Sequence, residues 1–181
     1  MTPHTAPFTL TVPVNHSDHF LGPASARVTI VEYGDFECPS CGQAYPAVNM
    51  LLKHFAGRVR YVFRQFPLRE VHPHAALAAE AAEAAGAQQK FWPMHNLLFE
   101  HQPHLKATHL RQYAGQAGLD LERYDYEMAD HRYLQRVQEH IDSGTGSGVR
   151  GTPTFFVNGV VKDTSFGFHA LQTAVDAALS A

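Results

Sequence analysis

The segment VTIVEYGDFECPSC, residues 28–41, decides the fold, because a buried strand runs directly into a helix that begins at two cysteines. Residues 28–33 are apolar on both faces, which predicts a central strand covered on both sides. From Pro39 the apolar residues follow helical spacing, and Gly57 ends the helix. The two cysteines therefore stand at the junction between a strand and the first turn of an amphipathic helix.

Cys38 and Cys41 are the only cysteines among the 181 residues, and three interpretations of them compete. A structural disulfide is the weakest, because closing so short a loop removes little entropy from the unfolded chain. Half of a zinc site is the second interpretation, since paired thiolates at this spacing bind zinc in tight hairpins. The sequence has no second pair of cysteines, however, and other candidate ligands lie far along the chain in helical and loop sequence: His101, His104 and His109.

Redox catalysis is the third interpretation, and the local physical chemistry favours it. Pro39 suits the first position of a helix, where its missing N–H leaves nothing unpaired. Cys38 then lies at the helix N-terminus, where free N–H groups and the helix dipole stabilise a thiolate. One turn later, Cys41 faces inward and can resolve a mixed disulfide formed by the first sulfur. We therefore expect a solvent-facing nucleophile at Cys38 and a shielded partner at Cys41.

Glu32 is a carboxylate on a strand that is otherwise apolar, six residues before Cys38. It falls on the same strand face as Val28 and Ile30. One interpretation is a charge at the end of the sheet that reaches solvent. The other is a partly buried proton acceptor that helps Cys41 become a thiolate, because desolvation would hold its proton affinity near the working pH.

Other polar residues near the motif are expected to lie at the surface. The loop that carries Asp35 and Glu37 is predicted to turn both side chains outward. His72, His74 and His95 are interpreted as helix-terminal or surface groups. None of these five residues is assigned a chemical role.

The rest of the chain supplies the other elements of an α/β fold. A short edge strand is predicted at residues 8–13, and a further strand at residues 59–66. The segment TFFVNGVV, residues 154–161, predicts a hairpin that turns at Asn158-Gly159. A last helix is expected over residues 169–180. A strand–helix–strand crossover makes its two strands parallel neighbours, and an antiparallel hairpin can extend the same sheet.

A block of helices separates the two parts of the predicted sheet. Residues 73–148 carry no convincing strand. The stretch AALAAEAAEAA, residues 75–85, is a strong helix former whose alanines permit close contact between helices. The sequence thus predicts a mixed central sheet flanked by helices, with an all-α insertion. Further amphipathic helices are expected at residues 91–101, 108–117 and 120–143.

A second motif, GVRGTPTFFVNG at residues 148–159, contains a proline directly before a strand. Its simplest role is that of a strand-start residue that needs no N–H. Together with GPASARVTIVEYGDFECPSCG, residues 22–42, however, it resembles the DsbA-like branch of the thioredoxin superfamily, in which a helical domain interrupts a thioredoxin-like fold. The resemblance runs from about residue 19 to the C-terminus. It implies three parts: an N-terminal extension (1–26), a thioredoxin-like domain (27–70 and 149–181) and a helical insertion (71–148).

The resemblance also implies the residues of a site. Cys38 matches the nucleophilic cysteine of the family, Cys41 matches the resolving cysteine, and Glu32 matches a buried acid six residues upstream. Thr152 precedes Pro153, which matches the cis-proline of the family. A cis bond there would turn the Thr152 backbone toward Cys38, where its N–H and C=O groups can pair with an extended substrate.

The implied function is thiol–disulfide exchange with cysteine-containing protein substrates, without a metal or organic cofactor and with an unidentified redox-recycling partner. The dipeptide between the cysteines, Pro39-Ser40, differs from the Pro-His of the best-known periplasmic oxidases and lacks their imidazole. The sequence leaves open whether the cysteine pair works as an oxidase or as a reductase or isomerase. We expect a redox potential between about −270 mV and about −120 mV, the values of thioredoxin and DsbA. A zinc-binding or partner-docking module that retains the fold is the alternative hypothesis.

Composition limits the other possibilities. Hydrophobic residues make up 45% of the chain and charged residues 17%, as in a globular protein. The formal net charge of −3 argues against nucleic-acid binding. No stretch reaches the roughly 18 consecutive apolar residues of a membrane span, and residues 1–20 lack the features of an export signal. We expect a cytoplasmic location as the sequence stands, or a periplasmic or extracytoplasmic one if a signal segment has been removed.

Overall fold

A mixed five-stranded sheet forms the centre of the computed structural model, which describes residues 8–165 and 167–181. Its strands follow the order β1-β3-β2-β4-β5. β2 and β3 are parallel, whereas every other neighbouring pair is antiparallel. The predicted mixed sheet is therefore confirmed. The strands are β1 (His19–Leu21), β2 (Val28–Gly34), β3 (Val59–Gln65), β4 (Thr154–Val157) and β5 (Val160–Lys162).

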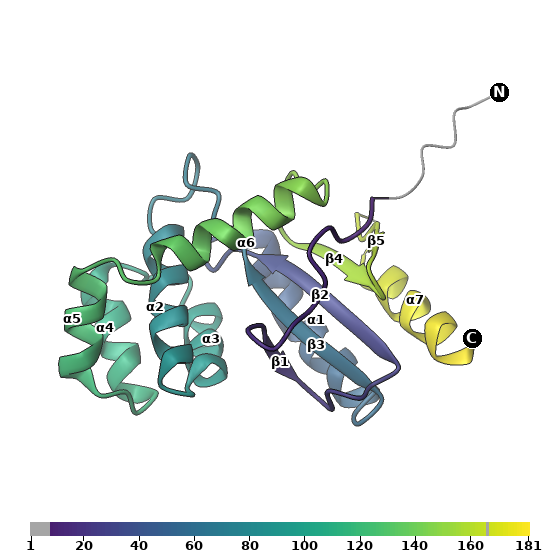
Figure 1. Cartoon of the computed structure of the whole chain (residues 1–181), viewed down its shortest axis with the longest axis horizontal. Helices are drawn as coiled ribbons and strands as arrows, with labels where there is room; N and C mark the ends of the chain where they lie inside the picture. The colour runs from purple at the N-terminus through teal and green to yellow at the C-terminus, as the bar shows by residue number, and fades with distance from the viewer. Residues whose placement is uncertain (1–7, 166) are drawn as a thin grey trace.

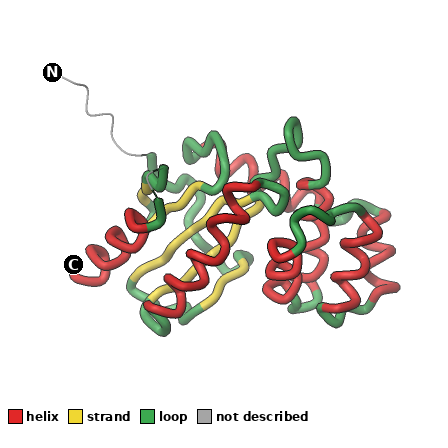
Figure 2. The backbone as a smooth tube through the Cα atoms, turned by 180° about the vertical axis from the view of Figure 1, so that it is seen from behind, coloured by secondary structure: helices red, strands yellow, loops and turns green. Residues whose placement is uncertain are grey.

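Helix α1 (Pro39–His54) connects β2 to β3 and forms the predicted crossover. β2 pairs with β3 on one side and with β4 on the other, and nearly all of its residues are buried, as expected of a central strand. Viewed from behind, α1 lies across the sheet (Figure 2). Because α1 begins shortly after β2 ends, the cysteine motif lies at the carboxyl end of the central strand.

Five helices between β3 and β4 form the predicted insertion. α2 to α5 lie at one side of the sheet, and α6 runs back along one face of the sheet (Figure 1). α2 lies at the centre of the insertion, and seven of its alanines are buried against neighbouring helices. The single helix predicted over residues 120–143 is two helices, because His131 adopts a left-handed φ of 47° that interrupts the helical backbone. Among the described residues, no helix is both long enough and apolar enough to cross a membrane. The helices are α2 (Ala75–Ala87), α3 (Phe91–Glu100), α4 (Ala107–Gln116), α5 (Leu121–Ala129) and α6 (Leu134–Gly146).

Helices cover both faces of the sheet and bury two sets of apolar side chains. Val28 and Ile30 belong to one core, together with residues of α1 and of α7 (His169–Ser180). Val31 and Tyr33 point to the opposite face and pack in a second core beside α6. Because side chains alternate along a strand, β2 contributes to both cores at once.

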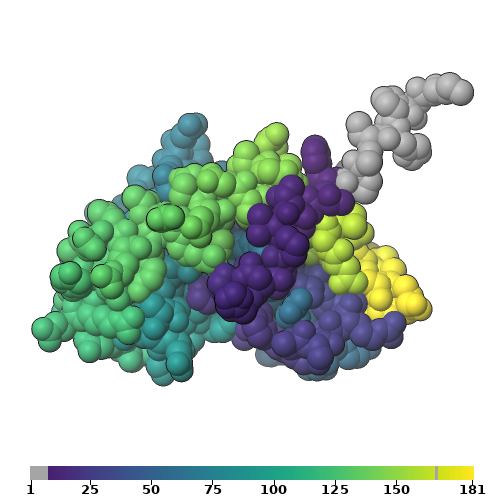
Figure 3. All heavy atoms as spheres, viewed as in Figure 1, coloured from purple at the N-terminus to yellow at the C-terminus, as the bar shows by residue number. Residues whose placement is uncertain are grey.

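The N-terminal segment crosses one face of the sheet before it reaches β1, as the dark purple atoms in Figure 3 show. Residues 8–13, which we predicted as an edge strand, form one isolated bridge within the described residues, between Thr9 and Val160. The short strand β1 was not predicted, because three residues carry too little alternation to be recognised. Residues 1–7 of the predicted extension lie outside the described residues.

The hairpin between β4 and β5 turns at Asn158-Gly159, as predicted. The φ angles of these two residues are 47° and 80°. Both values lie in the left-handed region that a type I′ turn requires, and asparagine and glycine tolerate it best. The turn therefore places β5 beside β4 at the edge of the sheet.

Candidate redox site

Cys38 is the residue that precedes the first turn of α1. Its backbone is extended, with φ −71° and ψ 121°, and Pro39 takes the first helical position, as predicted. The Cys38 N–H donates to the Asp35 carbonyl at 3.2 Å, which closes a turn just before the helix. The sulfur of Cys38 therefore lies at the end of α1 where backbone N–H groups are free.

Both cysteines are thiols in this structure, and both are largely covered. Cys41 is fully buried, as predicted, and only 6% of Cys38 is exposed. The expectation that Cys38 faces solvent is therefore wrong, because a loop from the other end of the chain covers it. Across this contact 3.4 Å separates Cys38 Sγ from the Thr152 carbonyl oxygen, to which the sulfur donates when it is protonated.

A cleft of about 580 Å³ opens beside the contact between Cys38 and Thr152. The Thr152-Pro153 peptide bond is cis. The Thr152 hydroxyl is buried beside the Cys38 sulfur. Thr152 and Pro153 therefore lie next to the cysteines in the structure, although they are far from them in the sequence. The lining residues are Ser40, Gln43, Thr152, Pro153, Thr164, Ser165, Gly167 and Phe168.

The pKa of Cys38 is lowered from 9.0 to about 5. A hydrogen bond from the Cys41 thiol is the largest cause, and burial opposes it. The Thr152 hydroxyl and the N–H groups of Cys41 and Ser40 lower the pKa further. All of these donors stabilise the thiolate, so Cys38 is ionised at neutral pH.

The pKa of Cys41 is shifted in the opposite direction from that of Cys38, and Glu32 contributes to this shift. Burial raises the pKa of Cys41 well above its ordinary value, and the hydrogen bond to Cys38 and the charges of Glu32 and Cys38 raise it further. Burial also raises the pKa of Glu32 to about 7. Only 3% of Glu32 is exposed, so it is buried beside the cysteines and does not reach solvent.

Tyr61 belongs to this site, although the sequence did not reveal it. Its hydroxyl donates to Glu32 Oε2 at 2.6 Å, and this bond lowers the pKa of Glu32 against the effect of burial. Tyr61 lies on β3 opposite Ile30, so its side chain joins the face that carries Glu32. Alternation within residues 59–66 was the available signal, but it identifies a partner only once the strand register is known.

Asp35 is buried and Glu37 is half-buried, contrary to the prediction that both turn outward. Only 1% of Asp35 is exposed; its Oδ1 accepts from the Glu37 N–H at 2.8 Å. Its Oδ2 accepts from the Leu68 N–H at 2.9 Å and lies 2.7 Å from His72 Nδ1. Glu37 Oε1 lies 2.8 Å from His74 Nδ1. These bonds tie the turn before Cys38 to the loop that follows β3, because buried carboxylates need such partners.

His95 is buried, contrary to its interpretation as a surface group. Only 4% of it is exposed, and burial lowers its pKa to about 4. The ring fills a cluster of aromatic side chains between the insertion and the sheet. These rings belong to Phe36, Tyr45, Phe63, Phe91, Trp92 and Phe99.

Zinc binding would require further ligands near the cysteines. Among residues 8–165 and 167–181, no three side chains of His, Cys, Asp or Glu converge as metal ligands would. His101 contacts the Leu97 carbonyl through Nδ1 and stacks on Tyr113, and the His104 and His109 rings lie 5.3 Å apart. The three histidines considered as ligands therefore have other neighbours within the insertion.

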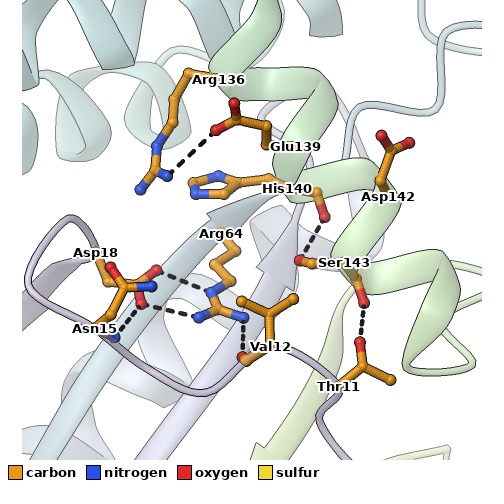
Figure 4. Close-up of a pocket in the computed structure, with 10 residues that line it drawn as sticks. All are labelled: Thr11, Val12, Asn15, Asp18, Arg64, Arg136, Glu139, His140, Asp142 and Ser143. Atoms are coloured by element: carbon orange, nitrogen blue, oxygen red, sulfur yellow. Dashed lines mark hydrogen bonds and ion pairs between the residues drawn. The ribbon is translucent and has the colours of Figure 1, made fainter.

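A second pocket, of about 510 Å³, lies on the opposite face of the sheet, between α6 and the N-terminal segment (Figure 4). At its base the Arg64 guanidinium pairs with Asp18 through two bonds of 2.9 Å. Arg64 also donates to the Val12 carbonyl, and Thr11 donates to the Ser143 carbonyl. These bonds fasten the N-terminal segment across the sheet.

The fold and the paired cysteines define a protein of the DsbA-like thioredoxin type, with a helical domain inserted between two parts of the sheet. The sequence agrees with this class. A model of the thioredoxin family matches residues 14–177, and the chain belongs to that family.

Solved structures of three bacterial proteins share this architecture. BdbD from Bacillus subtilis, in its oxidised form, has a TM-score of 0.83 and 24% identity, covering 91% of this chain and 94% of that one. A thioredoxin-like oxidoreductase from Silicibacter pomeroyi has a TM-score of 0.78 and 29% identity, and the match covers 92% of this chain and 95% of that one. α-DsbA1 from Wolbachia pipientis has a TM-score of 0.78 and 18% identity, covering 94% of each chain.

Relatives of higher identity are segments of much longer proteins. The chain is 52% identical to part of the Na(+)/H(+) antiporter NhaA 1 of Salinispora arenicola, over 94% of its own length and 26% of that protein. It is 49% identical to part of the antiporter NhaA 3 of Salinispora tropica, with the same two coverages. The chain thus spans about a quarter of the length of the curated relatives it matches.

Proposed function

We propose that this chain is a thiol–disulfide oxidoreductase that exchanges a Cys38–Cys41 dithiol or disulfide with the cysteines of protein substrates. One observation carries the proposal: two sulfurs in hydrogen-bonding contact have opposite proton affinities. The pKa of Cys38 is lowered to about 5, whereas that of Cys41 is raised well above its ordinary value. An ionised sulfur is the attacking and leaving group of disulfide exchange, and the buried second sulfur resolves the mixed disulfide once it has lost its proton.

Oxidation of a substrate dithiol proceeds in two exchange steps. A substrate thiolate attacks Sγ of Cys38, the Cys38–Cys41 bond breaks, and Cys41 leaves as a thiolate. The second substrate thiolate then attacks the substrate sulfur of the mixed disulfide, and Cys38 leaves as a thiolate. The substrate loses two electrons and the cysteine pair gains them.

In this scheme Glu32 exchanges a proton with Cys41. With a pKa of about 7, its carboxyl is partly protonated at neutral pH. It donates a proton when Cys41 leaves as a thiolate, and accepts one when Cys41 attacks in the reverse direction. A buried acid with a pKa near the working pH is suited to both roles.

The Thr152-Pro153 loop supplies the surface that holds a substrate. The backbone of Thr152 already contacts the Cys38 sulfur, and the adjoining cleft is open. An extended peptide can pair with such a backbone through its own N–H and C=O groups, which tolerates many sequences. We propose cysteine-containing proteins as substrates for this reason.

The low pKa of Cys38 favours the reduced pair, which makes the disulfide a better oxidant. We propose a potential between the values of thioredoxin and DsbA, about −270 mV and about −120 mV. Equilibration with glutathione measures it. A second thiol–disulfide partner, not yet identified, then resets the cysteine pair after each turnover.

Substitution of either cysteine tests the proposed exchange. Cys38→Ser is expected to abolish catalysed disulfide formation in a reduced, unfolded model protein, because no attacking sulfur remains. Cys41→Ser is expected to accumulate mixed disulfides with the same substrate. Unchanged turnover in Cys38→Ser would refute the assignment. Stoichiometric zinc that protects both thiols from titration would favour the metal-binding alternative instead.

The identity to parts of two antiporters supports a proposal about the partner. We propose that a sodium–proton antiporter is one protein with which this domain exchanges disulfides, because its relatives are segments of proteins with that name. The Cys41→Ala variant, expressed with the antiporter NhaA 1 of Salinispora arenicola, should trap it as a mixed disulfide that a reductant releases. Absence of the adduct, while a model substrate is trapped normally, would contradict this partner.

A further inference from the structure

We propose that Gln102, which follows α3 in the helical insertion, is a positioning residue for the proposed exchange reaction. It holds the turn that carries Cys38 in the geometry that favours the thiolate. This inference rests on the proposed function and adds a residue from the insertion to its site.

The amide of Gln102 makes two hydrogen bonds to the turn before α1. Its Nε2 donates to the Phe36 carbonyl at 2.8 Å and to the Cys38 carbonyl at 2.9 Å. An amide nitrogen carries two hydrogens, so both are used on this one turn. The two carbonyls belong to the residues on either side of Glu37. A single side chain therefore fixes the orientation of both peptide groups.

Gly42 leaves the space in which the Gln102 amide lies. A Cβ atom at position 42 would overlap Gln102 Oε1 and lie 2.7 Å from its Cδ. Glycine is unfavourable inside a helix, yet here any side chain would displace the amide from the turn. The glycine directly after Cys41 and the glutamine of the insertion therefore fit one another.

The electrostatic consequence concerns the Cys38 sulfur. Carbonyl oxygens are the negative ends of peptide dipoles, and the carbonyl groups of Phe36 and Cys38 belong to the same turn as the thiolate. Donation from Gln102 offsets their negative potential and keeps these dipoles in fixed directions. Loss of the amide leaves the carbonyl groups without this donor, and a carboxylate in its place would add negative charge at the same point.

Another contact keeps the insertion attached to α1 when Gln102 is changed. The Tyr45 hydroxyl donates to Glu100 Oε1 at 3.1 Å, and the Tyr45 ring stacks on Phe99 with centroids 5.3 Å apart. Substitution of Gln102 therefore tests the turn without removing the packing between α1 and α3.

The experiment compares Gln102→Ala, Gln102→Glu and Gly42→Ala with a matched glutamine of the insertion. Gln88 serves as the control, because its side chain also bonds to backbone, donating to the Asp120 carbonyl at 3.3 Å and accepting from the Asp120 N–H at 2.8 Å. Two quantities are measured on each reduced protein: the pH midpoint of Cys38 thiolate absorbance and the equilibrium constant with glutathione. Neither needs a protein substrate, so the result is independent of catalysed exchange.

Gln102→Ala is expected to raise the thiolate midpoint and shift the glutathione equilibrium about fivefold toward the disulfide form. The two lost hydrogen bonds act on the sulfur only through the turn, so their joint effect on the thiolate is set at the size of one hydrogen bond. Gln102→Glu should shift both further, Gly42→Ala should act in the same direction, and Gln88→Ala should match the wild type. A merely structural role would lower the thermal midpoint and leave both thiol measurements unchanged. Wild-type thiol values in both Gln102 variants would overturn the inference.

Discussion

The Tyr61 hydroxyl donates a 2.6 Å hydrogen bond to Glu32 Oε2 in the core between the sheet and α1. Two opposing effects meet at this bond. Burial raises the pKa of Glu32, and the hydrogen bond from Tyr61 lowers it, with a net value of about 7. The result is a buried acid that titrates near neutral pH, which a buried carboxyl without this donor would not do.

Tyr61→Phe is predicted to raise the pKa of Glu32, because the donor that stabilises the carboxylate is lost. The pH midpoint of the resolving step should move upward, as measured by mixed-disulfide decay across pH 5 to 9. Tyr33→Phe is the matched control, since its hydroxyl bonds to Ser143 on the opposite face of the sheet. A downward shift in Tyr61→Phe, or an equal shift in both variants, would contradict the prediction.

Glu32→Gln is predicted to stabilise the fold at alkaline pH. A pKa that rises from 4.5 to about 7 on folding means that the folded protein binds this proton more tightly. That stabilisation is complete below pH 4.5 and is lost as pH rises through about 7, at a cost of about 3 kcal/mol. The variant should therefore exceed the wild type in free energy of unfolding at pH 8, and the gain should shrink toward pH 4. Denaturant titrations measure both free energies of unfolding. A difference between variant and wild type that stays constant from pH 4 to pH 8 would contradict the prediction.

Cys41→Ala is predicted to raise the pKa of Cys38, because the Cys41 thiol provides the largest of the effects that lower it. The midpoint of thiolate absorbance should move from about 5 part of the way toward 9. Cys41→Ser should move it less, since a hydroxyl still donates to the sulfur. If alanine and serine gave the same midpoint, the donor role of Cys41 would be wrong.

Local signals in the sequence were enough to predict the framework of the fold and the centre of the site. Two-face burial of residues 28–33, Pro39 at a helix start and the Asn158-Gly159 turn each depend on a few neighbouring residues. The cysteine pair is local in the same sense. Such local signals do not depend on contacts with distant segments of the chain. The structure has the strands, the helix and the turn where they were expected.

Residues that join distant segments were not predicted. Tyr61 reaches Glu32 only through the register of β2 against β3, and Gln102 reaches the Cys38 turn only through the docking of the insertion. Asp35 was expected outside because a carboxylate in a loop usually is, but its partners come from the loop after β3. None of these pairings leaves a periodic pattern in the sequence, so no motif could reveal them.

The Asp35–His72 pair leads to a last prediction, in which stability depends on both pH and redox state. Desolvation lowers the pKa of His72, but the hydrogen bond and charge of Asp35 outweigh it, and the Cys38 thiolate raises the pKa further. Protonated His72 therefore stabilises the fold below its ordinary pKa of 6.5, and this contribution is lost as pH rises through the raised value. His72→Gln should lower the unfolding midpoint at pH 6 more than at pH 8.5, and more in the reduced protein, because a disulfide carries no charge. His16→Gln, on the exposed N-terminal segment, serves as control in the same denaturant titrations. Equal losses in reduced and oxidised His72→Gln would show that the thiolate does not act on this histidine.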